Sequence, residues 1–354
     1  MRRQPQKKAV TLKDLAAKTG YSINTVSRAL RGKDDISLET VEKIKKAANE
    51  MGYINNTIAS SLRLGYTNTI AVILGDISNP HFAIMTKEIE NHARKDGYSA
   101  ILLNTNENSE DELKAIKTAI NKSVDGIIIC PCQEKPDNIK FLMASGVPFI
   151  QIGRRSEGMD ASYVVCDDVY GGYLAASYLL DRGHERILFL KGPSYISSSR
   201  ERYEGYVQAH KERGIPVDEK LVREISVASS NVFQVMEEVM EEKTEFTAIF
   251  AFSDSVAWEA WTWLERHGYK VPGDYSLIGF DHIQSRMAIP FQLTTISSYK
   301  AQMSITALDC LMNKIRPGSA ADHGCEENCH HVIKTALVEG ATVLERKKQR
   351  TENP

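Results

Sequence analysis

The chain has 354 residues, of which 42% are hydrophobic, and its formal net charge is −2. This length leaves room for about two or three domains. No apolar run reaches the roughly 18 residues of a membrane span, and no signal peptide opens the sequence. The six cysteines are too sparse and uneven for a disulfide framework, so we expect a cytoplasmic protein without a membrane partner.

Charge is unevenly distributed along the chain. Residues 1–65 hold 13 of the 44 Lys and Arg residues but only 6 of the 46 Asp and Glu residues, a net charge of +7. A basic head on an acidic body is the distribution expected when one end meets phosphate. A solvated basic tail is the alternative, since four of the basic residues precede the first predicted helix: Arg2, Arg3, Lys7 and Lys8.

The first predicted element is a helix that begins after Thr11. Asp14 stands three residues on, at the spacing of a capping box. Gly20 ends the helix, where positive φ is often needed. The helix would bury three apolar residues that recur at helical spacing, Leu12, Leu15 and Ala16.

A second helix follows Ser22, its predicted N-cap, and turns Val26 and Leu30 inward. Its outer face carries small or hydrogen-bonding groups of the kind that fit a major groove: Ile23, Asn24, Ser27 and Arg28. Two short helices joined by a tight turn predict a helix-turn-helix that binds DNA.

A third helix is expected from Ser37 to Gly52, with an apolar face that closes a small core: Val41, Ile44, Ala48 and Met51. The next segment, NNTIASSLRLG, is too short to hold a helix alone in water. It could order when paired with its own copy against DNA, with Leu62 wedged between base steps of the minor groove. A plain interdomain linker is the other interpretation.

From Thr69 onward, short apolar runs alternate with helical stretches. Strands are expected at 69–74, 99–104, 125–130, 147–152, 162–166, 186–190, 247–252 and 275–280, and helices at 81–97, 110–122, 200–213 and 255–267. Continuous apolar strands separated by helices predict parallel sheets covered on both faces. Two such series indicate two lobes, with a ligand-binding cleft at the carboxyl ends of the strands.

The head is similar to that of the LacI/GalR family of bacterial transcription regulators. The similarity rests on Val10-Thr11-Leu12, Asp14, Ala16, Gly20, Ser22, Thr25-Val26-Ser27-Arg28, Ile36, Tyr53, Asn56, Ala59 and Leu62. It implies that Ile23 and Asn24 set base preference, that Ser22, Thr25 and Ser27 hold phosphates, and that Leu62 intercalates. The expected DNA-binding set is Thr11, Ser22, Ile23, Asn24, Thr25, Ser27, Arg28, Asn56, Ala59 and Leu62.

The body resembles the periplasmic sugar-binding fold that this family uses. Its landmarks are Asp76, Ser78-Asn79-Pro80-His81-Phe82, Asp125-Gly126, Asp167, Gly171-Gly172, Gly183-His184, Arg200, Arg202, Gly205, Asp254, Gly279-Phe280-Asp281 and Leu293-Thr294-Thr295-Ile296. The resemblance implies lobe crossovers near 167, 297 and 330. The expected divisions are an all-α helix-turn-helix domain at 1–54, a hinge at 55–66, a two-lobed α/β effector domain at 67–345 and a polar tail at 346–354.

The resemblance also implies an effector site in the cleft. Arg202 would donate paired hydrogen bonds to the ligand, Asp281 would accept from two adjacent sugar hydroxyls, and Phe82 would present an apolar face. Ser198, Ser253 and Ser298 would complete the polar lining. A surface salt bridge is the alternative for a lone Arg or Asp. Small residues at 227, 253 and 298 predict a pocket roomy enough for a disaccharide.

The expected protein is therefore a homodimeric repressor of carbohydrate-utilisation genes that binds palindromic operator DNA and has no cofactor. The resemblance implies that a sugar closes the cleft and thereby frees or pairs the hinge helices. An alternative keeps the DNA-binding head but takes a nucleobase or a partner protein as corepressor. An enzyme is not expected, because the sequence has no Gly-rich phosphate loop, nucleophile elbow or metalloprotease helix.

Three remaining patterns have simpler interpretations. The neighbours Asp167 and Asp168 should point apart, with a role in capping the helix near Tyr170. Trp258 and Trp261 share one side of a helix and indicate a core or dimer contact. A metal sensor is a third class of protein to consider. Its potential zinc ligands would be Cys325, Cys329, His330 and His331. Their spacing does not match that of a known zinc finger.

Overall fold

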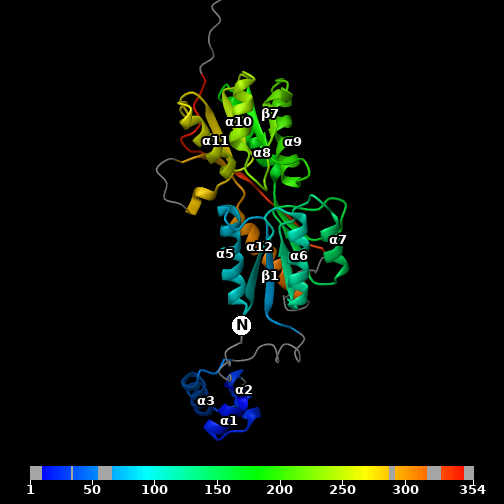
Figure 1. Ribbon diagram of the computed structural model, residues 1–354, viewed down its shortest axis with the longest axis vertical. Helices are drawn as coiled ribbons and strands as arrows, with labels where there is room; N and C mark the ends of the chain where they lie inside the picture. Colours follow the sequence, from blue (N-terminus) through cyan, green and yellow to red (C-terminus); the bar gives the residue numbers. More distant parts are fainter. Residues whose placement is uncertain (1–9, 33–34, 55–65, 287–291, 317–327, 347–354) are drawn as a thin grey trace, which may run out of the picture. The chain divides into compact units, whose positions relative to one another are not determined.

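The computed structural model describes residues 10–32, 35–54, 66–286, 292–316 and 328–346 (Figure 1). The chain divides into two compact units, Met1–Thr67 and Asn68–Pro354. The predicted hinge contacts of Asn56, Ala59 and Leu62, and the predicted metal ligand Cys325, lie outside the described residues. None of the described helices is long and apolar enough to cross a membrane.

The first unit contains the three predicted helices, α1 (Leu12–Thr19), α2 (Ile23–Leu30) and α3 (Leu38–Met51). Both predicted N-caps are confirmed: Thr11 forms a capping box with Asp14, and Ser22 accepts from the Thr25 amide. The structure adds a third cap, in which Ser37 accepts from the Thr40 amide. Gly20 ends α1 at a φ of 77°. A core of six buried side chains joins the helices: Leu15, Val26, Ala29, Ile44, Ala47 and Ala48.

The second unit contains two six-stranded sheets. The first has the order β11-β5-β4-β3-β1-β2, with strands His330–Ile333, Tyr163–Cys166, Phe149–Ile152, Gly126–Ile129, Thr69–Leu74 and Ser99–Asn104. The second has the order β12-β10-β9-β8-β6-β7, with strands Ala336–Val338, Thr294–Ser297, Ser276–Asp281, Ala248–Ala251, Ile187–Lys191 and Val222–Glu224. All pairs are parallel except β12 with β10, so one edge departs from the expected parallel arrangement.

Helices cover both faces of each sheet, as predicted. On the first sheet, alternate residues of β1 face α5 (Pro80–Lys95) and α12 (Lys300–Ile315) on one side, and α6 (Ser109–Asn121) and α7 (Asp137–Ala144) on the other. The second sheet lies between α8 (Asp168–Asp181) with α9 (Ser197–Glu212) and α10 (Val232–Glu241) with α11 (Asp254–Arg266). Both strand faces are buried, which explains the continuous apolar runs.

The chain crosses between the two sheets three times. It passes from β5 into α8 after Cys166, and returns from β10 to α12 after Ser297. The last crossing lies between Ile333 and Ala336. The sequence places it near 330; it falls a few residues later because β11 itself pairs with β5 in the first sheet.

Helices α8 and α9 approach each other backbone to backbone. A Cβ atom on Gly172 would lie 2.2 Å from the Arg202 carbonyl oxygen, and one on Gly205 would lie 2.0 Å from the Val169 carbonyl oxygen. Neither backbone atom can yield as a flexible side chain would. Glycine is therefore required at both positions, and the close approach brings Arg202 of α9 against the start of α8.

We predict that Gly205→Ala destabilises the protein by about 1–3 kcal/mol or more, because the added methyl group overpacks the contact with α8. The free energy of unfolding in urea measures this loss. Gln208→Ala, on the exposed side of the same helix, is the control and should change stability by no more than about 0.5 kcal/mol. Equal stability of the two variants would contradict the close helix packing.

Candidate functional site

Helix α2 has one buried face and one available face. Val26 and Ala29 are completely buried. Ile23, by contrast, is 49% exposed, Asn24 is exposed, and Thr25 and Ser27 are half-buried. The hydroxyl oxygens of Ser22 and Thr25 lie 2.9 Å apart at the start of the helix. The residues predicted to meet DNA thus form the free side of the second helix of a helix-turn-helix.

Arg28 at the end of α2 forms an ion pair with Asp35. Its Nε atom donates to Asp35 Oδ1 over 3.3 Å, and Nη2 contacts the second carboxylate oxygen. Both side chains are about half exposed, at 46% and 52%. A phosphate group that binds Arg28 must therefore compete with Asp35, a restraint that the sequence pattern does not reveal.

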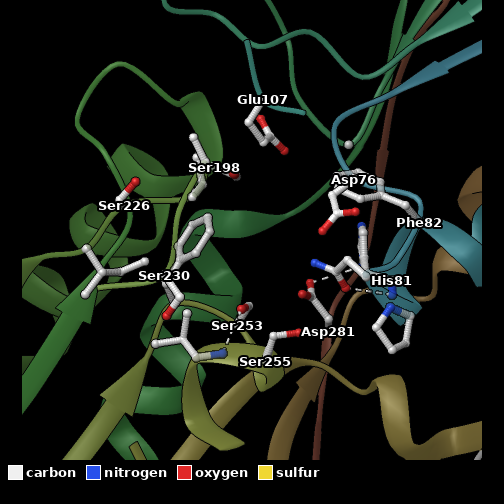
Figure 2. Close-up of a pocket in the computed structure, with 18 of the residues that line it drawn as sticks. Asp76, His81, Phe82, Glu107, Ser198, Ser226, Ser230, Ser253, Ser255 and Asp281 are labelled. Atoms are coloured by element: carbon white, nitrogen blue, oxygen red, sulfur yellow. Dashed lines mark hydrogen bonds and ion pairs between the residues drawn. The ribbon is translucent and has the colours of Figure 1, made fainter. Parts of the chain in front are cut away.

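A cavity of about 370 Å³ lies between the two sheets of the second unit (Figure 2). It is built by loops at the carboxyl ends of strands from both sheets: Asp76 follows β1, Arg154 follows β4, and Ser253 follows β8. This is the position expected for a ligand site in an open α/β sheet. Five of the six expected effector residues line the cavity, namely Phe82, Ser198, Arg202, Ser253 and Asp281.

The sixth expected residue, Ser298, lies elsewhere. It is 1% exposed and is not among the residues that line the cavity. Its hydroxyl oxygen is buried and has no hydrogen-bond partner among the described residues. Ser298 follows β10 at the second crossover, where the chain turns into α12.

Arg202 is held in a buried network at the floor of the cavity. Its Nε donates to Asp168 Oδ1 over 2.7 Å, and its Nη2 lies 3.7 Å from Asp281 Oδ1. The guanidinium carbon also lies 3.5 Å from the centre of the Phe280 ring. Two carboxylates and an aromatic ring therefore fix the orientation of this guanidinium before any ligand arrives.

Asp167 and Asp168 point apart, as their adjacency predicts. Asp167 caps α8 by accepting from the Tyr170 amide over 2.9 Å. Asp168 turns inward and is 1% exposed. Its burial raises the pKa of its carboxyl group to about 6, although the Arg202 charge opposes this shift. The sequence does not identify Asp168 as the partner of Arg202, because the two residues meet only through helix packing.

His81 is a cavity residue that the sequence analysis leaves out of the site. Its Nδ1 atom lies 3.5 Å from Asp281 Oδ1, and Figure 2 shows the two side chains together. Nδ1 is buried without a hydrogen bond to any described residue. Burial lowers the pKa of His81 to about 4, outweighing the opposite effect of Asp281. The ring is therefore neutral at pH 7, and Nδ1 faces the Asp281 carboxylate.

A second ion pair forms part of the cavity wall. Arg154 donates to both carboxylate oxygens of Glu107, over 2.6 and 3.0 Å, and the two side chains are 8% and 5% exposed. Glu107 lies in the loop after β2 and has a φ of 53°. Each residue follows a predicted strand, so the carboxyl-end rule could have identified both as cavity residues.

The comparisons with known proteins agree with this architecture. A family model of bacterial regulatory proteins, lacI family, matches residues 11–56, and a model of periplasmic binding proteins and sugar binding domain of LacI family matches residues 67–338. The chain belongs to the LacI family. It is a DNA-binding transcriptional regulator of that family, whose members are regulators rather than enzymes.

Two curated LacI-family relatives cover most of the chain. The HTH-type transcriptional regulator DegA of Bacillus subtilis (strain 168) is 35% identical over 291 residues, which are 81% of this chain and 86% of the relative. The HTH-type transcriptional repressor PurR of Actinobacillus pleuropneumoniae serotype 3 (strain JL03) is 29% identical over 306 residues, 86% and 91% of the two chains.

A solved structure of the lac repressor dimer, bound to operator and the anti-inducer ONPF, has a TM-score of 0.80 at 24% identity. The match spans 95% of this chain and 100% of the lac repressor chain. This likeness confirms the LacI-family fold predicted from the sequence: a helical DNA-binding domain and a body of two α/β lobes.

We predict that the stability of the wild type, relative to His81→Gln, falls as the pH decreases. The unfolded chain binds a proton at a pKa near 6.5, whereas folded His81 does so only near 4. The contribution of neutral His81 to the free energy of unfolding is therefore fully present above pH 6.5 and is lost as the pH falls towards 4. The loss approaches about 3 kcal/mol, at about 1.4 kcal/mol per pKa unit.

Denaturant unfolding of both proteins at several pH values measures this difference. Asp168 and the other buried carboxyl groups that do not contact His81 are present in both proteins, so their titration cancels in the difference. A stability difference that stays constant from pH 4 to 7 would show that folded His81 titrates normally.

Proposed function

We propose that this chain is a repressor of carbohydrate-utilisation genes whose affinity for operator DNA is controlled by a sugar in the cleft. The observation that carries the proposal is the chemistry of the cavity lining. Six serine hydroxyls surround the space, from Ser78, Ser198, Ser226, Ser230, Ser253 and Ser255. Figure 2 shows Ser198, Ser226 and Ser230 across the opening from Asp76 and His81.

The charges of the lining favour a neutral ligand that donates hydrogen bonds. Four carboxylates line the cavity, from Asp76, Glu107, Glu259 and Asp281. They outnumber the two guanidinium groups, and both of these already have carboxylate partners: Arg154 with Glu107, and Arg202 with Asp168. An anionic ligand would meet a surplus of negative charge, whereas the hydroxyls of a sugar can donate to carboxylates and to serine oxygens.

Apolar side chains complete the lining. Phe82 and Phe252 provide aromatic surfaces and Val227 an aliphatic one, and the carbon face of a sugar ring can pack against such surfaces. A volume of about 370 Å³ is within the ordinary range for small-molecule sites. A nucleobase or a partner-protein corepressor is the alternative. Both alternatives keep the same DNA-binding head.

The DNA-binding part of the proposal assigns base reading to Ile23 and Asn24 of α2. Thr11, Ser22, Thr25, Ser27 and Arg28 would contact phosphates and set the register. Two copies of the chain, as a homodimer, would meet the two halves of a palindromic operator. Effector control then requires that the sugar bind one arrangement of the lobes better than the other.

Isothermal titration calorimetry of the full chain, against neutral mono- and disaccharides, sugar phosphates and purines, tests the effector class. We expect a neutral sugar to bind. Asp281→Asn should weaken its binding by about tenfold to a hundredfold, the loss expected for a hydrogen bond to a charged group. Ser298→Ala is the matched control and should bind normally, because Ser298 lies outside the cavity lining. Binding of a purine but no sugar would refute the sugar proposal.

Operator binding is tested by fluorescence anisotropy on a palindromic duplex selected from randomised DNA. Arg28→Ala should weaken binding on all sequences and lower the salt slope by about 1, whereas Asp35→Ala should strengthen it by releasing Arg28. Asn24→Ala should cost about 1–3 kcal/mol and relax preference at one base pair. Lys18→Ala, on α1, removes the same single positive charge and is the control for Arg28→Ala in the salt-slope measurement. An unchanged salt slope in Arg28→Ala would contradict the phosphate contact.

A further inference from the structure

Three potential metal ligands meet at the edge of the first sheet, away from the cleft. Cys310 lies in α12, Cys329 immediately precedes β11, and His331 lies within β11. One ligand atom from each residue lies within 4.8 Å of the other two. Cys310 is buried, Cys329 is half-buried and His331 is exposed. The group therefore runs from the core to the surface, where an ion can enter.

The alternation of side chains along the edge strand places Cys329 and His331 on the same side of the sheet. Tyr163 donates its amide hydrogen to the Cys329 carbonyl over 2.8 Å, so the extended pairing with β5 begins at Cys329. Residues two apart on a strand face the same side, which places Cys329 with His331. His330 faces the other way and stacks on Tyr163, with ring centres 4.6 Å apart and planes within 13°.

The helix supplies the third ligand from the covered face of the sheet. Cys310 and Cys329 belong to the same apolar cluster, in which α12 packs on the strands beside α5 (Figure 1). Both sulfur atoms belong to free cysteines. The sequence pattern groups Cys329 and His331 with Cys325 and His330. Cys325 lies outside the described residues, and the structure removes His330 and adds Cys310 from a different element.

We propose that Cys310, Cys329 and His331 form a binding site for a thiophilic divalent cation, with Zn²⁺ as the ion that fits best. Bond lengths of about 2.3 Å to sulfur and about 2.0 Å to nitrogen place tetrahedral ligand atoms roughly 3.5–3.8 Å apart. The observed group needs only a small contraction to reach this. Both thiols would release their protons on binding. The exposed side at His331 leaves the fourth coordination position to water.

An ion at this site would tie α12 to the outermost strand of the first sheet. α12 follows the second crossover between the sheets, and β11 precedes the third. Metal binding to the folded chain alone raises its stability by mass action. The site therefore predicts a rise in the thermal-unfolding midpoint when Zn²⁺ is added, and this rise does not depend on the identity of the cleft ligand.

The test uses the reduced full-length chain, titrated with Zn²⁺ in competition with a chromophoric chelator and with Co²⁺ followed by its thiolate charge-transfer absorption. We expect one ion per chain. The neighbouring histidines form a matched pair of exposed variants: His331→Ala should weaken Zn²⁺ binding at least about tenfold, whereas His330→Ala should leave it unchanged. Cys329→Ser removes one of the two thiolates and should therefore remove about half of the cobalt–thiolate absorption per bound ion.

The histidine pair keeps the test decisive even if a substitution at buried Cys310 unfolds the chain. Failure to take up Zn²⁺ beyond buffer controls would overturn the proposal. Equal weakening by His330→Ala and His331→Ala would overturn it too, because the ion would then bind elsewhere. A Cys310–Cys329 disulfide in the oxidised chain, without Zn²⁺ uptake by the reduced chain, would assign the sulfur pair to redox chemistry instead.

Discussion

The buried guanidinium of Arg202 is the constraint on which the effector-binding unit depends. A cation removed from water is stable only when its charge and its hydrogen-bond donors have partners. Asp168 supplies one partner from the first turn of α8, and Asp281 supplies another from the end of β9. Asp168 comes within reach because Gly172 and Gly205 let α8 and α9 touch through their backbones. The packing of α8 against α9 therefore sets the position of the charged groups in the cavity.

The same arrangement explains the character of the cavity. Since Arg202 and Arg154 already have carboxylate partners, their charges hold the walls in place rather than attract an anion. His81 stays neutral and lies beside Asp281. Serine hydroxyls supply the rest of the polar surface. Such a lining suits a ligand with many hydroxyl groups and no net charge.

Local chemistry could be predicted from the sequence more fully than side-chain contacts. The caps at Thr11 and Ser22 and the apolar strands depend on near neighbours, and the structure confirms them. Contacts between distant elements escaped prediction: the Asp168–Arg202 pair needs the crossing of α8 and α9, and Ser298 is not part of the cavity lining. The antiparallel strand β12 also escaped, since its partner is chosen by the last crossover.

The central claim is that one equilibrium links the cleft to operator binding. Linkage requires that a ligand which changes operator affinity by some factor has its own affinity changed by the same factor when the operator is bound. The direct measurement is the Kd of the cleft-binding sugar for the chain alone and for the chain saturated with its operator duplex. We expect two different values, whose ratio equals the sugar's effect on the operator Kd. Identical sugar affinities with and without DNA would contradict it.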